Sequence, residues 1–128
     1  MMTRLLCILA MMTSFSSCTI DERVIPLIGV YRAHVLGITG PFDLIISSHR
    51  GDNLLIEAPF DGDNWEIIEI DVDNKNYDVV DIDIFKQELN TYLTIHGDGF
   101  YSNGTLELKY CIRQGGNCTD YTIVATKR

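Results

Sequence analysis

The fold is decided by the stretch Ile95-His-Gly-Asp-Gly-Phe-Tyr-Ser-Asn-Gly-Thr-Leu-Glu-Leu-Lys-Tyr-Cys-Ile112. Asn103-Gly104 at its centre is the strongest short signal for a β-hairpin, because both central positions of a type I′ turn need φ > 0. A two-residue loop there pairs Ser102 with Thr105. The same register sets Tyr101 opposite Leu106, Gly99 opposite Leu108, Gly97 opposite Tyr110 and Ile95 opposite Ile112. Each of these residues is apolar or glycine, so the register predicts one buried face shared by both strands.

A second hairpin carries this register toward the C-terminus. If Cys111 faces Cys118, then Leu108 faces Tyr121 and Leu106 faces Ile123, again on the inner face. On the outer face Lys109 then lies between Asp98 and Asp120, where opposite charges across strands add up to about 1 kcal/mol each. The two registers agree on which face is buried.

The rest of the chain has the same texture of short apolar runs cut by Gly, Asn, Asp and Pro every eight to twelve residues. That spacing is typical of an all-β sandwich or barrel. We expect an all-β fold, a single small antiparallel barrel or half-barrel of about eight strands joined by up-and-down hairpins. The expected strands are 29–36, 42–49, 53–60, 65–73, 77–85, 92–101, 105–113 and 118–126, and 85–89 could form one helical turn. The expected core is Ile70, Val80, Ile82, Ile95, Leu106, Leu108, Tyr110, Tyr121 and Ile123.

The N-terminal segment is typical of a bacterial lipoprotein export signal. Arg4 precedes an apolar run from Leu5 to Met12, and the small residues Ser16 and Ser17 lead into Cys18. The run is too short to span a bilayer, which needs about 20 apolar residues. We therefore expect a signal peptide over 1–17, lipidation of Cys18, a tether over 18–27 and a β-barrel domain over 28–128. An ordinary secretory signal is the alternative.

The charge of the chain excludes some partners. The formal net charge is −8, and every acidic residue follows Cys18, which argues against nucleic acid and against charge-driven docking on anionic lipid. The segment 57–88 is the most acidic part and forms either a solvated face or a loose cation-binding cluster. Asp61-Gly-Asp-Asn64 and Asp71-Val-Asp-Asn74 lack the ligand pattern of a helix–loop–helix calcium site, since Trp65 and Lys75 occupy the fifth positions.

The cysteines and histidines complete the set of candidate site residues. Cys111 and Cys118 form an even pair in a chain expected to be exported, which predicts a disulfide. As a metal site the pair lacks a third ligand at a useful sequence spacing, so we expect no metal and no cofactor. The register above places His96 on the outer face beside Cys111. Neither His34 nor His49 belongs to a local motif, and we expect no enzymatic activity.

Several loose motifs resemble those of small lipoproteins of Bacteroides-type bacteria, which carry a calycin-like (lipocalin-like) β-barrel domain. They are Ser16-Ser-Cys18, Gly29-Val-Tyr31, Gly97-Asp-Gly99, Ser102-Asn-Gly-Thr105, Leu106-Glu-Leu-Lys-Tyr110 and Tyr121-Thr-Ile-Val-Ala-Thr-Lys127. The resemblance implies a fold and a location at the outer membrane, with no catalytic residues. Asp21-Glu22 resembles the acidic signal that routes such lipoproteins to the cell surface, so we expect the surface rather than the periplasmic face.

These observations lead to one expected function and one alternative. We expect a lipid-anchored, non-catalytic envelope or cell-surface binding or accessory protein, anchored in the membrane by its lipid. Its partner would be a small apolar ligand in a barrel cavity, with room left by Gly97, Gly99 and Ala33, or a basic protein. The alternative is that Gly97 and Gly99 allow the strands to bend and pack closely, so that they leave no cavity. The alternative function is an inhibitor of a lysozyme-like or protease enzyme that acts through an acidic loop.

Overall fold

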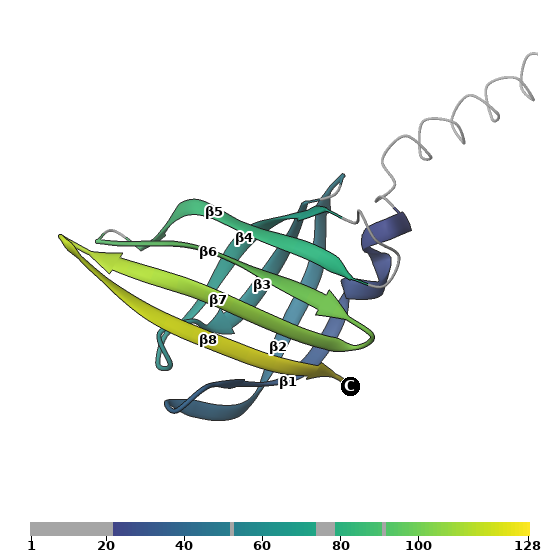
Figure 1. The fold of residues 1–128 in the computed structure, drawn as a ribbon, viewed down its shortest axis with the longest axis horizontal. Helices are drawn as coiled ribbons and strands as arrows, with labels where there is room; N and C mark the ends of the chain where they lie inside the picture. Colours follow the sequence, from purple (N-terminus) through teal and green to yellow (C-terminus); the bar gives the residue numbers. More distant parts are fainter. Residues whose placement is uncertain (1–21, 52, 74–78, 91) are drawn as a thin grey trace, which may run out of the picture.

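The structure, a computed structural model, describes residues 22–51, 53–73, 79–90 and 92–128. It is a closed barrel of antiparallel strands in sequence order, with β1 paired to β8 as well as to β2 (Figure 1). The expected all-β barrel is confirmed, in its closed form. The elements are a 3₁₀ helix η1 (Glu22–Leu27), β1 (Gly29–Val35), β2 (Thr39–Arg50), β3 (Asn53–Pro59), β4 (Trp65–Asp73), β5 (Val80–Asn90), β6 (Leu93–Ser102), β7 (Thr105–Gln114) and β8 (Asn117–Lys127).

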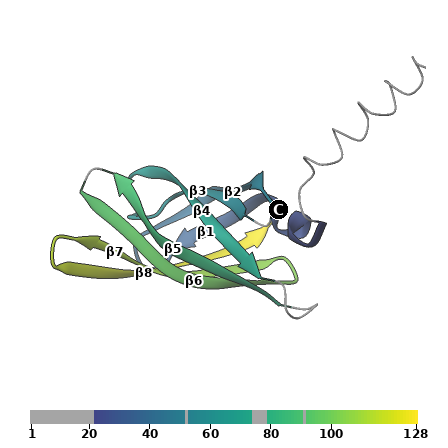
Figure 2. The same ribbon diagram turned by 90° about the horizontal axis from the view of Figure 1, so that it is seen from above.

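The strands differ in reach. β5 to β8 extend beyond β1 to β4 at the end of the barrel opposite η1 (Figures 1 and 2). The pairing pattern agrees: β8 pairs with β1 only from Ile123 onward, and β5 pairs with β4 only over Asp81–Asp83. The tip of the β7–β8 hairpin therefore stands clear of the strands across the barrel.

The barrel interior is apolar and filled. Alternate residues of every strand point inward, as the twofold period of a strand requires, and they form one hydrophobic cluster. Eight of the nine residues expected in the core are buried, and the ninth, Tyr121, is half-buried and packs against the cluster. The sequence pattern thus identified the inner face correctly.

The β6–β7 hairpin has the register expected from Asn103-Gly104. Both turn residues have positive φ, 52° and 85°, and all five expected pairs are present. The glycines on β6 are required by the close approach of β7, because a Cβ on Gly97 would lie 2.2 Å from the Lys109 carbonyl oxygen. The space above Gly97 is therefore taken by β7 itself, which favours strand bending over a ligand cavity there.

The β7–β8 hairpin corrects the expected register by two residues. Cys111 faces Asp120, and Cys118 faces Arg113, because the two-residue loop is Gly115-Gly116. Gly115, the first loop residue, has φ +62°, a value that Gly adopts without strain. The expected register would have placed Gln114 at this loop position. A shift of two residues keeps every side chain on its face. Leu108 now faces Ile123 and Leu106 faces Ala125, and on the outer face Lys109 faces Thr122 instead of Asp120.

Apolar side chains close both ends of the barrel, and we call these side chains the stoppers. At one end η1 places Val24 and Leu27 in the core, so packing begins within the segment 18–27 that was expected to be a tether. At the other end Phe60 is fully buried. Each stopper is held by a buried tyrosine: the Tyr31 hydroxyl donates to the Leu27 carbonyl, and the Tyr110 hydroxyl donates to the Phe60 carbonyl. Burial raises the pKa of both phenols, so each remains a donor at neutral pH.

β5 also differs from expectation. It continues to Asn90 as a strand, so the helical turn expected over 85–89 is wrong. A register shift between Ile84 and Gln87 interrupts the alternation there, which explains why the pattern was ambiguous. Beyond this shift β4 and β5 no longer pair by backbone. The Gln87 side chain bridges them instead, accepting from the Glu69 amide at 2.9 Å and donating to its carbonyl at 2.7 Å.

Candidate functional site: the outer face of β4 to β8

The acidic residues of the sequence gather on the outer face of three neighbouring strands. Asp71 on β4 lies directly across from Asp83 on β5, and Asp83 lies directly across from Asp98 on β6. We call these three the acidic row. One step along the strands, Asp73 faces Asp81. Together these five residues line a shallow hollow of about 420 Å³ with Ile82 and Gly99, here named the acidic hollow.

The described residues compensate little of the negative charge of the acidic row. Within residues 22–51, 53–73, 79–90 and 92–128, no Lys or Arg forms an ion pair with Asp71, Asp83 or Asp98. Lys109 faces Asp98 across the strands, but its ammonium group lies 3.7 Å from Glu107 instead. Two unit charges about 5 Å apart repel by about 0.8 kcal/mol in the dielectric of water. Like charges directly across strands therefore cost the fold stability.

The acidic residues of the β3–β4 turn, Asp61 and Asp63, lie apart from the acidic row, and Asp61 has a structural role. In the β3–β4 turn Asp61 Oδ1 accepts from the amides of Asp63 and Asn64 at 2.9 and 2.7 Å, and Oδ2 accepts from the Asn64 side chain at 2.9 Å. Partial burial opposes ionisation of Asp61, but these hydrogen bonds outweigh it and hold the pKa of the carboxyl below its ordinary value. Asp61 therefore stabilises the β3–β4 turn, a role that Asp commonly has.

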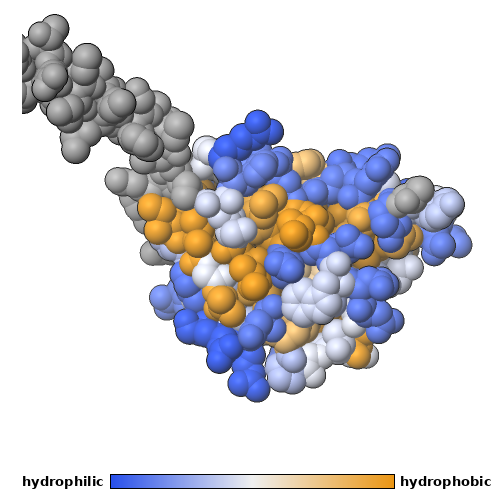
Figure 3. All heavy atoms as spheres, turned by 180° about the vertical axis from the view of Figure 1, so that it is seen from behind, coloured by the Kyte–Doolittle hydropathy of each residue, from blue (hydrophilic) through white to orange (hydrophobic). Residues whose placement is uncertain are grey.

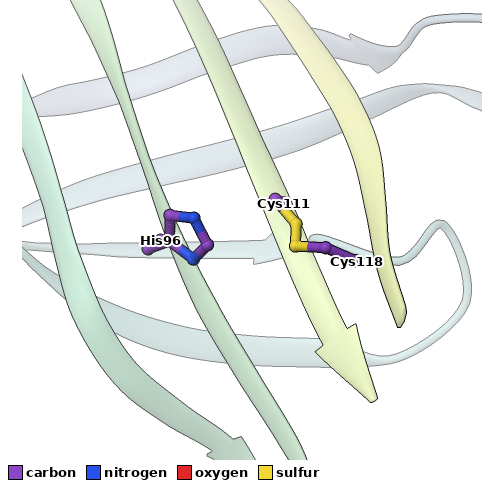
Figure 4. Close-up of side chains that lie close together, drawn as sticks. All are labelled: His96, Cys111 and Cys118. Carbon is purple, nitrogen blue, oxygen red and sulfur yellow. A yellow bond between two sulfur atoms is a disulfide. The ribbon is translucent and has the colours of Figure 1, made fainter. Parts of the chain in front are cut away.

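A sulfur and imidazole cluster lies beside the acidic row on β6 to β8. Cys111 and Cys118 form a disulfide with their Cα atoms 5.7 Å apart. They are diagonal neighbours on the outer face, one on each strand of the β7–β8 hairpin. His96 faces Cys111 from β6, and the ligand atoms of all three residues lie within 4.8 Å of one another (Figure 4). We call these residues the cysteine cluster. The sequence register placed His96 next to Cys111, and the structure brings its imidazole close to the two sulfur atoms, although no third ligand lies at a useful spacing along the sequence.

A hollow of about 430 Å³ borders the cysteine cluster. Its lining comes from three consecutive residues on each of three strands: His96–Asp98, Lys109–Cys111 and Asp120–Thr122. Asp98 belongs to this hollow and to the acidic hollow, so the two hollows adjoin across β6.

The other histidines lie elsewhere. His49 Nε2 lies 2.7 Å from a Glu69 carboxylate oxygen on the outer face of β2 to β4, and Glu69 also accepts from the Asn53 side chain at 3.2 Å. His34 packs over Gly40. A His–carboxylate pair is the kind of group that an enzyme uses, but neither hollow described above is lined by His49 or Glu69.

The outer face of β1 to β4 has a different character. Val30 lies directly across from Ile45, and both are exposed, as is Ile67 on β4. Seen from behind, the molecule shows apolar side chains gathered over this side among hydrophilic ones (Figure 3). Exposed apolar side chains are thus a feature of β1 to β4, although β4 also carries Asp71 of the acidic row.

The residues expected to direct export lie mostly outside the described part of the chain. Cys18 and Asp21 are in this group, and Glu22 begins η1. No helix among the described residues is long and apolar enough to cross a membrane.

No family model, no curated protein and no solved structure matches this chain. The class that the coordinates define is an eight-stranded, all-antiparallel, up-and-down β-barrel, an architecture consistent with the calycin-like fold.

Proposed function

We propose that this chain is a non-catalytic binding protein of the cell envelope that recognises a basic protein through its acidic hollow. The observation that carries the proposal is the acidic row, three aspartates directly opposite one another on adjacent strands. Repulsion within the acidic row lowers the stability of the fold, so these aspartates are better explained by binding than by folding. A partner rich in Lys and Arg would neutralise the row and recover that cost on binding.

The filled barrel directs recognition to the outside. A small apolar ligand would need an interior cavity with a mouth. Here Val24 and Leu27 close one end, Phe60 closes the other, and all three are within 2 % of full burial. The glycines that could have left room are covered by β7. We therefore prefer a protein partner to an apolar ligand in the barrel.

The shape of the surface favours broad docking over insertion into a cleft. An inhibitor that blocks an active-site cleft would present its acidic groups on a protruding loop. The hairpin that reaches furthest, β7–β8 (Figure 1), carries Gln114-Gly-Gly-Asn117 at its tip and no carboxylate there. In the described residues the aspartates of the acidic row lie on strands. Enzyme inhibition is therefore an outcome of the test below, not the first proposal.

The test uses lysozyme as a basic protein probe and an acidic protein of similar size as its control. We expect the chain to bind lysozyme with an affinity that falls steeply as salt rises, since contacts between exposed charges are screened over about 8–10 Å. Asp83→Lys, at the centre of the acidic row, should weaken binding by about tenfold or more, which corresponds to about 1.4 kcal/mol. Glu88→Lys makes the same charge change on β5 outside the acidic hollow and should change affinity much less.

Each result has a defined meaning. Equal binding of the basic and acidic probes, or equal loss in the two variants, would remove the acidic hollow as the binding surface. A parallel assay of lysozyme activity separates docking from inhibition. Loss of activity that tracks occupancy and disappears in Asp83→Lys would make the chain an inhibitor that uses the same face.

We also propose that the chain is a lipoprotein, anchored through Cys18 at the outer membrane and exposed on the cell surface. The support is the sequence of the export signal and its small residues before Cys18. Cys18→Ala should leave the protein in the aqueous phase of a detergent partition, whereas the parent enters the detergent phase, because each buried acyl CH₂ contributes about 0.8 kcal/mol. Equal recovery of both in the detergent phase would contradict the anchor. Protease digestion of intact cells then distinguishes surface from periplasmic exposure.

A further inference from the structure

We propose that the cysteine cluster is a redox-gated site for a borderline-soft divalent cation of the zinc class. In the disulfide form the site is closed. When the Cys111–Cys118 bond is reduced, the two thiolates and the His96 imidazole together supply a Cys₂His ligand set. This site lies on the outer face of β6 to β8 and does not depend on the proposed binding of a basic protein.

The geometry of the three side chains supports the proposal. They come from three neighbouring strands: His96 faces Cys111 directly, and Cys118 is diagonal to Cys111 across the hairpin. Their ligand atoms lie within 4.8 Å of one another. A tetrahedral zinc ion with Zn–S near 2.3 Å and Zn–N near 2.0 Å needs the donor atoms of a Cys₂His set about 3.5–3.8 Å apart. Rotation of side chains after the disulfide opens is therefore enough, because the strands already hold the Cα atoms of the two cysteines 5.7 Å apart.

Two neighbouring features favour a cation. Asp120 lies directly across from Cys111 on β8, and Asp98 and Asp120 line the hollow that borders the cluster. Their negative potential attracts divalent ions and opposes escape. Three protein ligands leave one coordination position open for water, as in catalytic zinc sites.

The gating step is a balanced two-electron reduction. A phosphine reductant and one water convert the disulfide to two thiols, and the phosphine becomes its oxide. Each thiol then loses its proton to solvent as the metal binds, so two protons are released per ion. Cys118 is exposed whereas Cys111 is 8 % exposed, so a reductant can reach the bond at the hairpin surface.

The experiment uses the full chain with Cys7→Ser and Cys18→Ser, so that only Cys111 and Cys118 can supply thiolates. Cobalt(II) is the probe, because thiolate-to-cobalt charge-transfer absorption reports sulfur ligation directly. The phosphine-reduced protein should bind one cobalt per chain with this absorption and release it to zinc. The oxidised protein should show no such absorption.

Two variants and one control assign the ligands. Cys118→Ser should abolish the charge-transfer absorption or halve its intensity. His96→Ala should weaken cobalt binding by about tenfold or more, as loss of a metal-site contact does. The matched control is His34→Ala on β1, which should bind as the parent does. Circular dichroism of each reduced protein verifies that the barrel is intact. Absence of charge transfer in the folded, reduced parent would overturn the proposal, and so would equal affinities of His96→Ala and the parent.

Discussion

The inner and outer faces of β5 to β8 are built from alternating residues of the same strands, yet they follow opposite rules. Inside, each side chain lowers the free energy of the fold: Leu108, Tyr110 and Ile123 are buried and pack into one cluster. Outside, Asp83 and Asp98 face each other at a cost in free energy. The inner face is therefore explained by folding alone, whereas the acidic outer face needs a reason other than stability.

The largest effect expected from this comparison is at Leu108. Leu108→Ala should lower the free energy of unfolding by roughly 2–5 kcal/mol, because the side chain is fully buried and its removal leaves a cavity. Its neighbour Lys109 points outward, so Lys109→Ala should cost less than about 1 kcal/mol. Urea denaturation of the two variants measures the difference. Similar losses in both would mean that the faces are not distinct.

The barrel ends give the next effect. Tyr110→Phe removes the donor to the buried Phe60 carbonyl and should cost about 1–3 kcal/mol, since that acceptor is left without its partner inside the protein. Tyr121→Phe is the matched control: it stacks on Tyr110 but is only half-buried, and we expect a change below about 0.5 kcal/mol. If thermal unfolding shows a larger loss of stability in Tyr121→Phe than in Tyr110→Phe, the Tyr110 hydroxyl does not hold Phe60 in place.

These elements also show what could be predicted from the sequence. Asn103-Gly104 fixed the β6–β7 register because only one turn type suits those residues. The predicted β7–β8 register was wrong by two residues, because the loop is Gly115-Gly116. The error was not visible in the pattern, because a shift of two residues leaves every side chain on the same face. Neither barrel stopper was foreseen, because Tyr31 and Tyr110 bond to backbone carbonyls, which leave no trace in side-chain patterns. The acidic row was visible only as composition until pairing aligned its three members.

Asp61 tests an acidic residue that does serve the fold. Asp61→Ala should cost about 1 kcal/mol near neutral pH, by loss of the turn hydrogen bonds, while Asp63→Ala should be nearly neutral. Because the pKa of Asp61 is lower in the folded than in the unfolded chain, its contribution is complete above the unfolded value of about 3.9 and is lost as pH falls through the folded value. Stability curves of parent and variant should therefore converge in acid. Curves that stay parallel would contradict a role for the ionised carboxylate.

The smallest expected effect has the opposite sign. Asp83→Asn removes repulsion from both Asp71 and Asp98 and should raise the free energy of unfolding by a few tenths of a kcal/mol, up to about 1. Asp43→Asn makes the same change beside Arg128, 3.0 Å away, and should leave stability unchanged or slightly lower. Added salt should shrink the gain at Asp83. A loss of stability in Asp83→Asn would mean that its carboxylate has a favourable partner.

The most direct test measures two quantities on one variant, Asp71→Asn/Asp83→Asn/Asp98→Asn, which neutralises the whole acidic row. At low salt we expect its free energy of unfolding to rise by up to about 1 kcal/mol, about as much as in Asp83→Asn, because Asp83 belongs to both like-charge pairs. Its affinity for lysozyme should fall by about tenfold or more. Opposite movement of stability and affinity is the signature of a surface kept for binding at the expense of folding. A variant that is less stable than the parent, or that binds lysozyme equally well, would contradict the account.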